Sequence, residues 1–356
     1  MMGIDFQGLR IGPGQRCFII AEAGVNHNGD LDRALALVDA AALCGADAVK
    51  FQTFVSEELI VRHGPKARYH IETTGSDEEQ SWFALLKSQE LSAEAFAALK
   101  HRCQERGIEF MSTPYDVTSV RLLDSLDVKS FKVASTDTNN HPLLVAMAAT
   151  GRPVILSTGM CTMAEVAASV AALRAAGCTQ LVLTQCTADY PAPIAEANLR
   201  AMVRMGEDLG VAVGYSDHVP GSVAALGAVA LGACLYERHF TLDCTLPGPD
   251  HRASMEPGPF AALVADIRAL ESALGDGIKR VMPSESANRP ILRKHVIARH
   301  AIAAGAVVTE ADLTVKRTGG AGVTPDRLGS LIGCRLVRAV VADEPITEDL
   351  IASAQS

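Results

Sequence analysis

Eight short apolar runs, each followed by a stretch rich in Ala and Leu, limit the fold of this chain more than any other feature. The runs span residues 17–24, 47–54, 108–114, 130–135, 153–159, 180–187, 211–218 and 234–241. They are continuously apolar rather than alternating, which is typical of parallel strands that are covered by helices on one side and packed inside a barrel on the other. Eight such strand–helix units predict an α/β fold, a (β/α)8 barrel; a doubly wound sheet is the alternative that the even spacing and the number of units disfavour.

Signals for helix ends lie where this fold requires them. A glycine closes several of the helical stretches just before the next run, at Gly45, Gly107, Gly151, Gly177, Gly210 and Gly232. Glycine accepts the left-handed conformation of a helix C-terminus. Thr162 and Glu165 have the spacing of a capping box, and Ser92 precedes another helical stretch.

The chain is longer than a barrel requires. It has 356 residues, against about 250 for a typical (β/α)8 barrel. We predict a barrel over residues 1–280, a linker rich in Gly, Pro, Ser and Asn at 281–290, and a small β-rich domain over 291–356. Residues 55–90 form a long insertion after the second strand and are a candidate lid or active-site wall.

Composition excludes several classes of partner. The net charge is −9 and the longest basic run is Arg293-Lys294, so nucleic acid and anionic lipid are poor partners. The longest apolar stretch, 223–236, is interrupted by glycine and shorter than the roughly 20 residues that span a bilayer. The start of the sequence lacks the apolar segment of a secretory signal. Nine cysteines without C-x-x-C spacing argue against a zinc knuckle or disulfide framework, and we expect a cytoplasmic protein.

Polar residues gather at the C-terminal ends of the predicted strands. They are Glu22, Lys50, Gln52, Thr113, Lys132, Ser135, Asp137, Ser157, Gln185, Thr187, Ser216, Asp217, His218, Glu237 and His239. Barrel enzymes carry their chemistry at this end. Each buried ionisable group must be desolvated and paired, so a purely structural barrel has no use for so many of them. This convergence predicts an enzyme.

Two lysines stand out because they lie in otherwise apolar strands. Lys50 and Lys132, with nearby hydroxyl groups, can bind the oxygens of phosphate and carboxylate groups. The structural alternative is that each lysine pairs with Glu22 or Asp137. A third possibility is that one of them forms a Schiff base, as strand lysines of barrel aldolases do.

Two histidines end neighbouring predicted strands. Strands are about 4.8 Å apart, so His218 and His239 can reach one divalent cation. Asp217, Glu237 and Asp250 lie nearby in the sequence and favour a cation such as Mn²⁺. Taken singly, each histidine can instead be a hydrogen-bonded residue of the core or rim.

Three loops are candidates for a binding role. Two of them have a structural alternative, and the third is excluded as a phosphate loop. Residues 247–251 (PGPDH) form a rigid turn that either aims Asp250 at the C-terminal end of the barrel or is a capped surface loop. Residues 26–29 (NHNG) are either a sugar-binding turn or the entry to the first helix. Residues 319–322 (GGAG) are not a phosphate loop, because the G-x-x-x-x-G-K-[ST] spacing is missing.

Long segments of the chain resemble the N-acetylneuraminate (sialic acid) synthase family. In the barrel they are IIAEAGVNHNGDLDRALALVDAAALCGADAVKFQTF, FKVASTDTNNHPLL, ILSTGM, QCTADYPAP, GYSDH and ERHFTLDCTLPGPDHRASMEPG. The segments TVKRTGGAGVTP and LIGCRLVRAVVADEPIT resemble the antifreeze-like (SAF) domain of the same family. The resemblance covers nearly the whole chain and its motifs occur in order.

The resemblance implies a metal-dependent transferase reaction. Phosphoenolpyruvate would condense with the open-chain aldehyde of N-acetylmannosamine, or a related N-acetylated amino sugar, to give a nine-carbon sialic acid and phosphate. His218 and His239 would hold Mn²⁺, with Mg²⁺ or Co²⁺ as alternatives. Asp137 would handle the protons of the metal-bound water, and Glu22 completes the expected catalytic set.

The resemblance also assigns the two substrates. Phosphoenolpyruvate would be bound by Lys50, Gln52, Lys132, Ser135, Ser157 and Ser216. The sugar would be positioned by Glu22, Tyr190 and Asp250, and by Arg317 from the partner subunit of a domain-swapped homodimer. Without the resemblance, Arg317 is simply an exposed turn residue.

Two departures from the family pattern leave alternatives open. Many bacterial members have Glu at the position of Asp137, where this chain resembles the animal-type synthases. Ala188 stands where a small polar residue is usual. The nearest alternative is a sibling synthase that makes legionaminic or pseudaminic acid from a 2,4-diacetamido-trideoxyhexose. A class I aldolase that uses Lys132, and a non-enzymatic sugar- or ice-binding module, are the other two.

Overall fold

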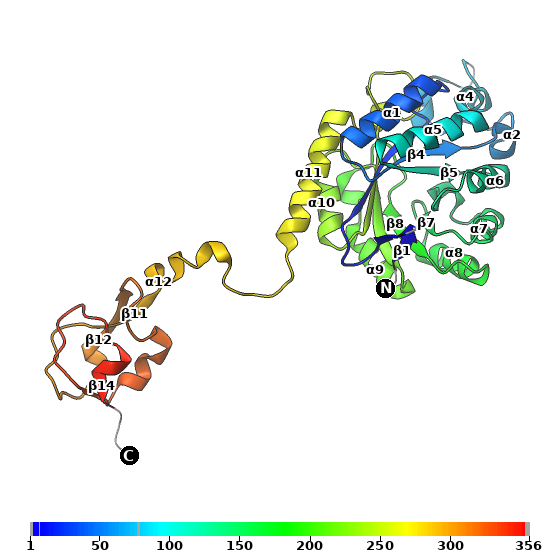
Figure 1. Cartoon of the computed structure of the whole chain (residues 1–356). Coiled ribbons are helices and arrows are strands. Elements are labelled where there is room, and N and C mark those ends of the chain that lie inside the picture. Colours follow the sequence, from blue (N-terminus) through cyan, green and yellow to red (C-terminus); the bar gives the residue numbers. More distant parts are fainter. Residues whose placement is uncertain (1–2, 7, 77–78, 353–356) are drawn as a thin grey trace. The chain divides into compact units, whose positions relative to one another are not determined.

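The computed structural model describes residues 3–6, 8–76 and 79–352. The chain divides into two compact units, of which the first ends at Gly275 and the second begins at Asp276. Figure 1 shows the strands of the first unit surrounded by helices. Within the described residues we find no helix that is both long and apolar enough to cross a membrane.

The first unit is built on eight parallel strands. They are β3 (Phe18–Gly24), β4 (Ala48–Thr53), β5 (Glu109–Pro114), β6 (Phe131–Val133), β7 (Val154–Ser157), β8 (Leu181–Cys186), β9 (Ala212–Asp217) and β10 (Leu235–His239). Their order in the sheet is β5-β4-β3-β10-β9-β8-β7-β6, and β5 and β6 come together where the sheet closes. An ion pair of 2.6 Å between Lys129 Nζ and Glu109 Oε2 lies at that closure. The predicted (β/α)8 barrel is confirmed, and each of the eight predicted runs contains one strand.

Helices follow the strands and cover the outside of the barrel (Figure 1). They are α1 (Leu31–Leu43), α5 (Ala93–Arg106), α6 (Val117–Ser125), α7 (His141–Ala148), α8 (Met163–Ala175), α9 (Leu199–Leu209), α10 (Val223–Ala230) and α11 (Pro257–Leu274). Thr162 and Glu165 form the predicted capping box of α8, and the Ser92 side chain caps α5. Gly107 ends α5 in the left-handed conformation, as its position predicts. These local signals place each helix next to the strand it covers.

The lower half of the barrel interior is apolar. One buried cluster contains inward-facing residues of the strands, among them Ile20, Met111 and Ile155. An N-terminal antiparallel hairpin, β1 (Ile4–Phe6) and β2 (Leu9–Ile11), adds Ile4 and Ile11 to this cluster. The sequence analysis did not predict the hairpin, because each strand has only three residues. Burial of such side chains stabilises the fold by about 1.5–3 kcal/mol each.

The insertion after β4 folds into three short helices. They are α2 (Ser56–Leu59), α3 (Arg68–Thr74) and α4 (Trp82–Gln89). The Ser81 side chain caps α4 by accepting a hydrogen bond from the Ala84 N–H at 3.2 Å. The predicted insertion therefore has secondary structure of its own over its described residues.

The second unit has a small core of its own. Its elements are α12 (Asn288–Leu292), β11 (Lys294–Ala298), β12 (Leu313–Arg317), β13 (Arg335–Leu336) and β14 (Ile351–Ala352). β11 pairs with β12 in antiparallel register, with Lys294 opposite Arg317. Val296, Leu313 and Ile346 are buried in its core.

Candidate active site

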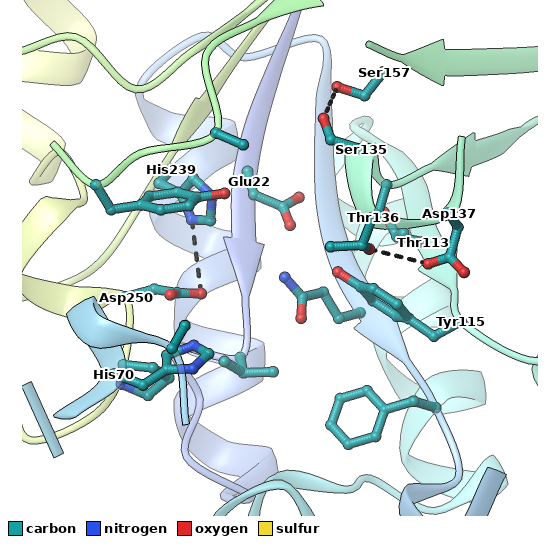
Figure 2. A pocket seen from close by; sticks show the side chains of 18 of the residues that line it. Glu22, His70, Thr113, Tyr115, Ser135, Thr136, Asp137, Ser157, His239 and Asp250 are labelled. Atoms are coloured by element: carbon teal, nitrogen blue, oxygen red, sulfur yellow. Dashed lines mark hydrogen bonds and ion pairs between the residues drawn. The ribbon is translucent and has the colours of Figure 1, made fainter. Parts of the chain in front are cut away.

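A cavity of about 560 Å³ lies at the C-terminal ends of the barrel strands. Twelve of the thirteen residues that were assigned a catalytic or binding role from the sequence line it: Glu22, Lys50, Gln52, Lys132, Ser135, Asp137, Ser157, Tyr190, Ser216, His218, His239 and Asp250. Figure 2 shows Ser135, Ser157 and Asp137 on one side of the cavity, and His239 and Asp250 on the other. The thirteenth, Arg317, is exposed at the end of β12 in the second unit.

Four buried charged residues form the floor of the cavity. Lys50 makes an ion pair with Glu22 and lies 3.6 Å from Glu237 Oε1, measured from its Nζ. Lys132 Nζ is also 3.6 Å from Glu237 Oε1. All four residues are at most 5% exposed. We call them the charged floor. Two lysines and two glutamates balance one another when all are ionised.

Burial and neighbouring charges set the pKa values of this floor. Burial raises the pKa of Glu22 to about 7, although Lys50 partly opposes the rise. Burial also lowers the pKa of Lys132. For Lys50 the opposing pull of Glu22 and Glu237 outweighs burial and raises its pKa. Burial likewise works against ionisation of Glu237, but Lys132 and Lys50 overcome it and lower the pKa of that carboxyl. Lys50 is therefore the firmly charged cation, and Glu22 is the carboxyl that can take up a proton near neutral pH.

Hydroxyl groups stand beside the charged floor. Ser135 Oγ donates to Ser157 Oγ at 2.9 Å and accepts from the Gly159 N–H at 3.0 Å. Ser216 Oγ donates to Glu237 Oε1 at 3.2 Å. A Cβ on Gly159 would lie 2.7 Å from Ser135 Oγ, so a larger residue there would have to displace that hydroxyl. Hydroxyls next to two ammonium groups can bind anionic oxygens.

The two histidines face each other across the opposite side of the cavity. Their ring centroids are 5.4 Å apart. His218 Nδ1 contacts the carbonyl oxygen of Thr187 at 2.7 Å and Cys186 Sγ at 3.7 Å. His239 Nδ1 lies 3.9 Å from Asp250 Oδ2 and has no hydrogen-bond partner in the described structure. A backbone carbonyl on one ring nitrogen leaves the other nitrogen of His218 available as a ligand.

The donors on this side fit a divalent cation with an open coordination sphere. Burial lowers the pKa of His239 well below its usual value, so the imidazole is neutral, the form that binds metals. Burial raises the pKa of Asp250 to about 6. Within residues 3–6, 8–76 and 79–352, no group of three His, Cys, Asp or Glu side chains is close enough to hold a metal. The two imidazoles would thus leave coordination positions for water or substrate oxygens.

Asp217 does not belong to the cavity, contrary to its use in the sequence analysis as support for a metal. It accepts hydrogen bonds from the Tyr236 hydroxyl and the Val219 N–H, both at 2.8 Å, and pairs with Arg238 at 3.1 Å. Side chains alternate along a strand, so Asp217 points outward between Ser216 and His218. It is a structural residue of the barrel wall.

Asp137 lies on the same side of the cavity as Ser135 and Ser157 and is half-buried (Figure 2). It accepts hydrogen bonds from Asn140 Nδ2 at 2.9 Å and from Thr136 Oγ1 at 3.1 Å. Burial raises its pKa. The structural alternative that paired Lys132 with Asp137 is wrong, because Lys132 pairs with Glu237. Asp137 is therefore available to exchange a proton.

The loop at residues 26–29 does not line the cavity. Asn26 Nδ2 donates to the Phe240 carbonyl and to Ser254 Oγ, both at 2.9 Å. His27 is buried, and its Nδ1 accepts from the Gly29 N–H at 3.0 Å. The structure therefore favours the alternative in which this loop is the entry to the first helix, and the loop also braces the segment that carries Asp250.

The sequence analysis gave no role to several lining residues. Glu237 was predicted as one of the polar residues at the strand ends and as a possible neighbour of a metal, but not as the residue that bridges both lysines. Its spacing of two from His239 on one strand is a signal that both face inward. The wall from the insertion, which includes Tyr69, His70 and Trp82, was predicted only as a segment. Nothing in its local sequence indicates which side chains turn inward.

Two family models and several known proteins match this chain. The family model described as the NeuB family matches residues 37–279, and the SAF domain model matches residues 293–352. The chain is 41% identical to the N,N'-diacetyllegionaminic acid synthase of Campylobacter jejuni, over 94% of this chain and 100% of that one. It is 37% identical to the human N-acetylneuraminate-9-phosphate synthase, over 97% of this chain and 96% of that one.

A solved structure is similar in fold. The N-acetylneuraminic acid (sialic acid) synthetase of Leptospira borgpetersenii, solved with citrate, superposes with a TM-score of 0.69 and is 35% identical. The match covers 80% of this chain and 94% of that chain.

Proposed function

This chain belongs to the NeuB family, and we propose that it condenses phosphoenolpyruvate with the open-chain aldehyde of an N-acetylated amino sugar, releasing phosphate and a nine-carbon sugar acid. One observation carries the proposal. A single cavity holds two buried lysines beside a hydroxyl cluster on one side and two histidines with Asp250 on the other. The two sides suit an anionic and a neutral polar substrate, respectively.

The charged floor accounts for the binding of phosphoenolpyruvate. Lys50 and Lys132 would clamp its phosphate and carboxylate, with Ser135, Ser157 and Ser216 as hydrogen-bond donors. A polyanion next to Glu22 favours protonation of that carboxyl, whose pKa is already about 7. Proton uptake by Glu22 frees Lys50 for the substrate without an uncompensated buried charge.

The histidine side would position the acceptor. His218 and His239 would hold a divalent cation, which we propose to be Mn²⁺; when bound it supplies Lewis-acid polarisation. Tyr190 stacks over His218 with ring centroids 4.1 Å apart and limits how the sugar can lie. Asp250 accepts hydroxyl hydrogen bonds when ionised.

The reaction balances with the residues present. C3 of phosphoenolpyruvate forms a bond to the aldehyde carbon, and the aldehyde oxygen gains a proton. A water oxygen adds at C2 and gives a proton to Asp137, whose raised pKa suits a general base. The C2–O bond to phosphate then breaks, and Lys50 and Lys132 stabilise the departing phosphate. The two protons of this water end on the former aldehyde oxygen and on the released phosphate, so the products are the sugar acid and inorganic phosphate.

A second acceptor is favoured by a specific observation. Besides N-acetylmannosamine, the cavity could take a 2,4-diacetamido-trideoxyhexose, the acceptor of a legionaminate-type synthase. The insertion lines the cavity with Leu59, Ile60 and Leu85, and Phe54, just before the insertion, adds to the same lining. An apolar wall suits a sugar that has a methyl group and a second acetamido group in place of hydroxyls.

The proposal includes a homodimer as the oligomeric state and the cytoplasm as the compartment. We propose a domain-swapped homodimer in which Arg317 reaches the partner's acceptor. Mixing Arg317→Ala protein with Lys132→Met protein should then restore turnover that neither has alone, because mixed dimers contain one intact site. All nine cysteines lie within the described residues and are free, which supports the cytoplasm as the compartment.

Phosphate release tests the reaction. Purified protein is given phosphoenolpyruvate and Mn²⁺ with either acceptor, with an EDTA control and with His239→Ala as the matched variant. We expect release that depends on the acceptor, is lost with EDTA, and is abolished in His239→Ala. Borohydride trapping with pyruvate distinguishes the Schiff-base alternative. Covalent labelling of Lys132 and full activity in EDTA would replace our proposal with a class I aldolase.

A further inference from the structure

Three polar atoms on the insertion wall of the cavity have no hydrogen-bond partner among the residues that the structure describes. They are His70 Nδ1, Trp82 Nε1 and Gln89 Oε1. All three residues line the cavity, and His70 and Gln89 are only 9% and 4% exposed. We call these three residues the wall triad.

Such atoms are uncommon in a folded protein. Roughly 90% or more of buried polar groups have a partner, because a buried group without one loses its hydrogen bonds to water and gains none in return. Three on one wall of one cavity are best explained by a ligand group that completes them. The ligand group must offer both a donor and an acceptor, because Trp82 Nε1 only donates and Gln89 Oε1 only accepts.

Apolar side chains lie beside the wall triad, and the Lys66 ammonium is the charged group that acts on His70. Leu59, Ile60 and Leu85 line the same part of the insertion. Burial lowers the pKa of His70 to about 4, so its ring is neutral at physiological pH. The Lys66 amine donates to the carbonyls of Gly75 and Ser76. A neutral group with an N–H, a carbonyl and a methyl matches these features, which describes an acetamido group.

The wall triad is remote from the reacting groups. A chain of ring contacts runs from His239 to Tyr190, Tyr69, His70 and Trp82. Successive centroid distances are 5.4, 5.0, 4.0 and 5.2 Å. Figure 2 shows His70 on the far side of Asp250 from His239. A group bound by the wall triad therefore lies at the end of the sugar away from its aldehyde.

We propose that the wall triad is a subsite for a second acetamido group, at C4 of the acceptor, and so selects a diacetamido sugar. Trp82 Nε1–H and the Nδ1–H of the neutral His70 ring donate to the acetamido carbonyl, which has two lone pairs. Gln89 Oε1 accepts from its N–H, and the methyl packs on Leu59 and Ile60. The inference rests on the proposed function for the identity of the acceptor.

Two variants test the subsite with little change in volume. Trp82→Phe removes the indole N–H and keeps an aromatic ring, and Gln89→Met removes the amide and keeps the length. The kcat/KM for a 2,4-diacetamido-trideoxyhexose should fall about tenfold in each, the usual cost of one hydrogen bond to a buried group. The value for N-acetylmannosamine should change less than about threefold, since it lacks the second acetamido group. Gln80→Met, in the same insertion but outside the cavity lining, is the matched control and should change neither value.

Calorimetric titration with the two free sugars separates this inference from the proposed function. Tighter binding of the diacetamido sugar by the unmodified protein, weakened tenfold in both variants, supports the subsite even if no phosphate is released. Equal affinity for the two sugars, or variants that weaken both sugars alike, overturns it. Absence of phosphate release with either sugar counts only against the proposed reaction. Thermal melting of each variant shows whether the fold is intact.

Discussion

The two halves of the barrel interior use the same strands for opposite purposes. In the lower half the inward side chains are apolar, and a step of two residues along each strand reaches the polar upper half. The pairs are Ile20 and Glu22, Ala48 and Lys50, Met111 and Thr113, Ile155 and Ser157, and Leu235 and Glu237. On each strand, the position along the barrel axis therefore decides whether an inward-facing residue contributes to stability or to the active site.

The energetics of the two halves differ accordingly. Each apolar side chain of the lower half stabilises the fold by its burial. Each charge of the upper half is desolvated and is retained only because a partner of opposite charge stands beside it. Removing an inward-facing side chain should therefore reduce stability in the lower half and activity in the upper half.

The largest effect is expected from the charged floor. Lys132→Met removes one cation from the phosphate side and should lower kcat/KM by about 10²–10³-fold, the usual cost of one electrostatic contact to the reacting groups. Phosphate release at varied phosphoenolpyruvate and saturating acceptor measures this kcat/KM, which is that for phosphoenolpyruvate. Lys129→Met is the matched control, because Lys129 pairs with Glu109 at the lower end of the same region. Comparable losses in the two variants would contradict the division between halves.

The lower half should show the reverse. Ile155 is fully buried in the apolar cluster, so Ile155→Ala should reduce the free energy of unfolding by about 2–5 kcal/mol. The folded fraction should keep its kcat within about twofold. Ser157→Ala, two residues further along β7, should lose activity with little change in stability. Denaturant unfolding monitored beside phosphate release gives both quantities, and a large loss of kcat in Ile155→Ala would show that the two halves are coupled.

The sequence contains most of this division, because it follows from local patterns. Continuous apolar runs and glycine-terminated helices predicted the barrel, and its C-terminal strand ends predicted the lining from Glu22 to His239. The errors arose where direction or tertiary contact decides. Asp217 and Ser216 are adjacent, and only strand alternation sends one outward. The lysine partner of Glu237 and the wall triad depend on contacts between segments far apart in the chain.

Glu22 in the upper half should make the unfolding free energy depend on pH. The pKa of Glu22 rises to about 7 because of burial, so folding favours its protonated form. Its contribution to stability is fully present below the unfolded pKa near 4.5 and is lost as pH rises through about 7. Relative to Glu22→Gln, the unmodified protein should lose about 3 kcal/mol across this window, at 1.36 kcal/mol per pKa unit. Unfolding free energies of both proteins from pH 4 to 8 test it. Parallel curves would mean that Lys50 keeps Glu22 ionised throughout.

The smallest effect is expected from charges at the lower rim. Arg16 pairs with Asp47 but is 62% exposed, and exposed pairs contribute about 0–1 kcal/mol. Asp47 also binds Arg268 at 2.7 Å and accepts the Ile19 N–H at 2.8 Å, so it stays satisfied without Arg16. Arg16→Ala should therefore change the unfolding free energy by less than about 1 kcal/mol and leave kcat unaltered. A loss of unfolding free energy as large as that of Ile155→Ala would show that the stability of the lower half also depends on the ion pairs around Asp47.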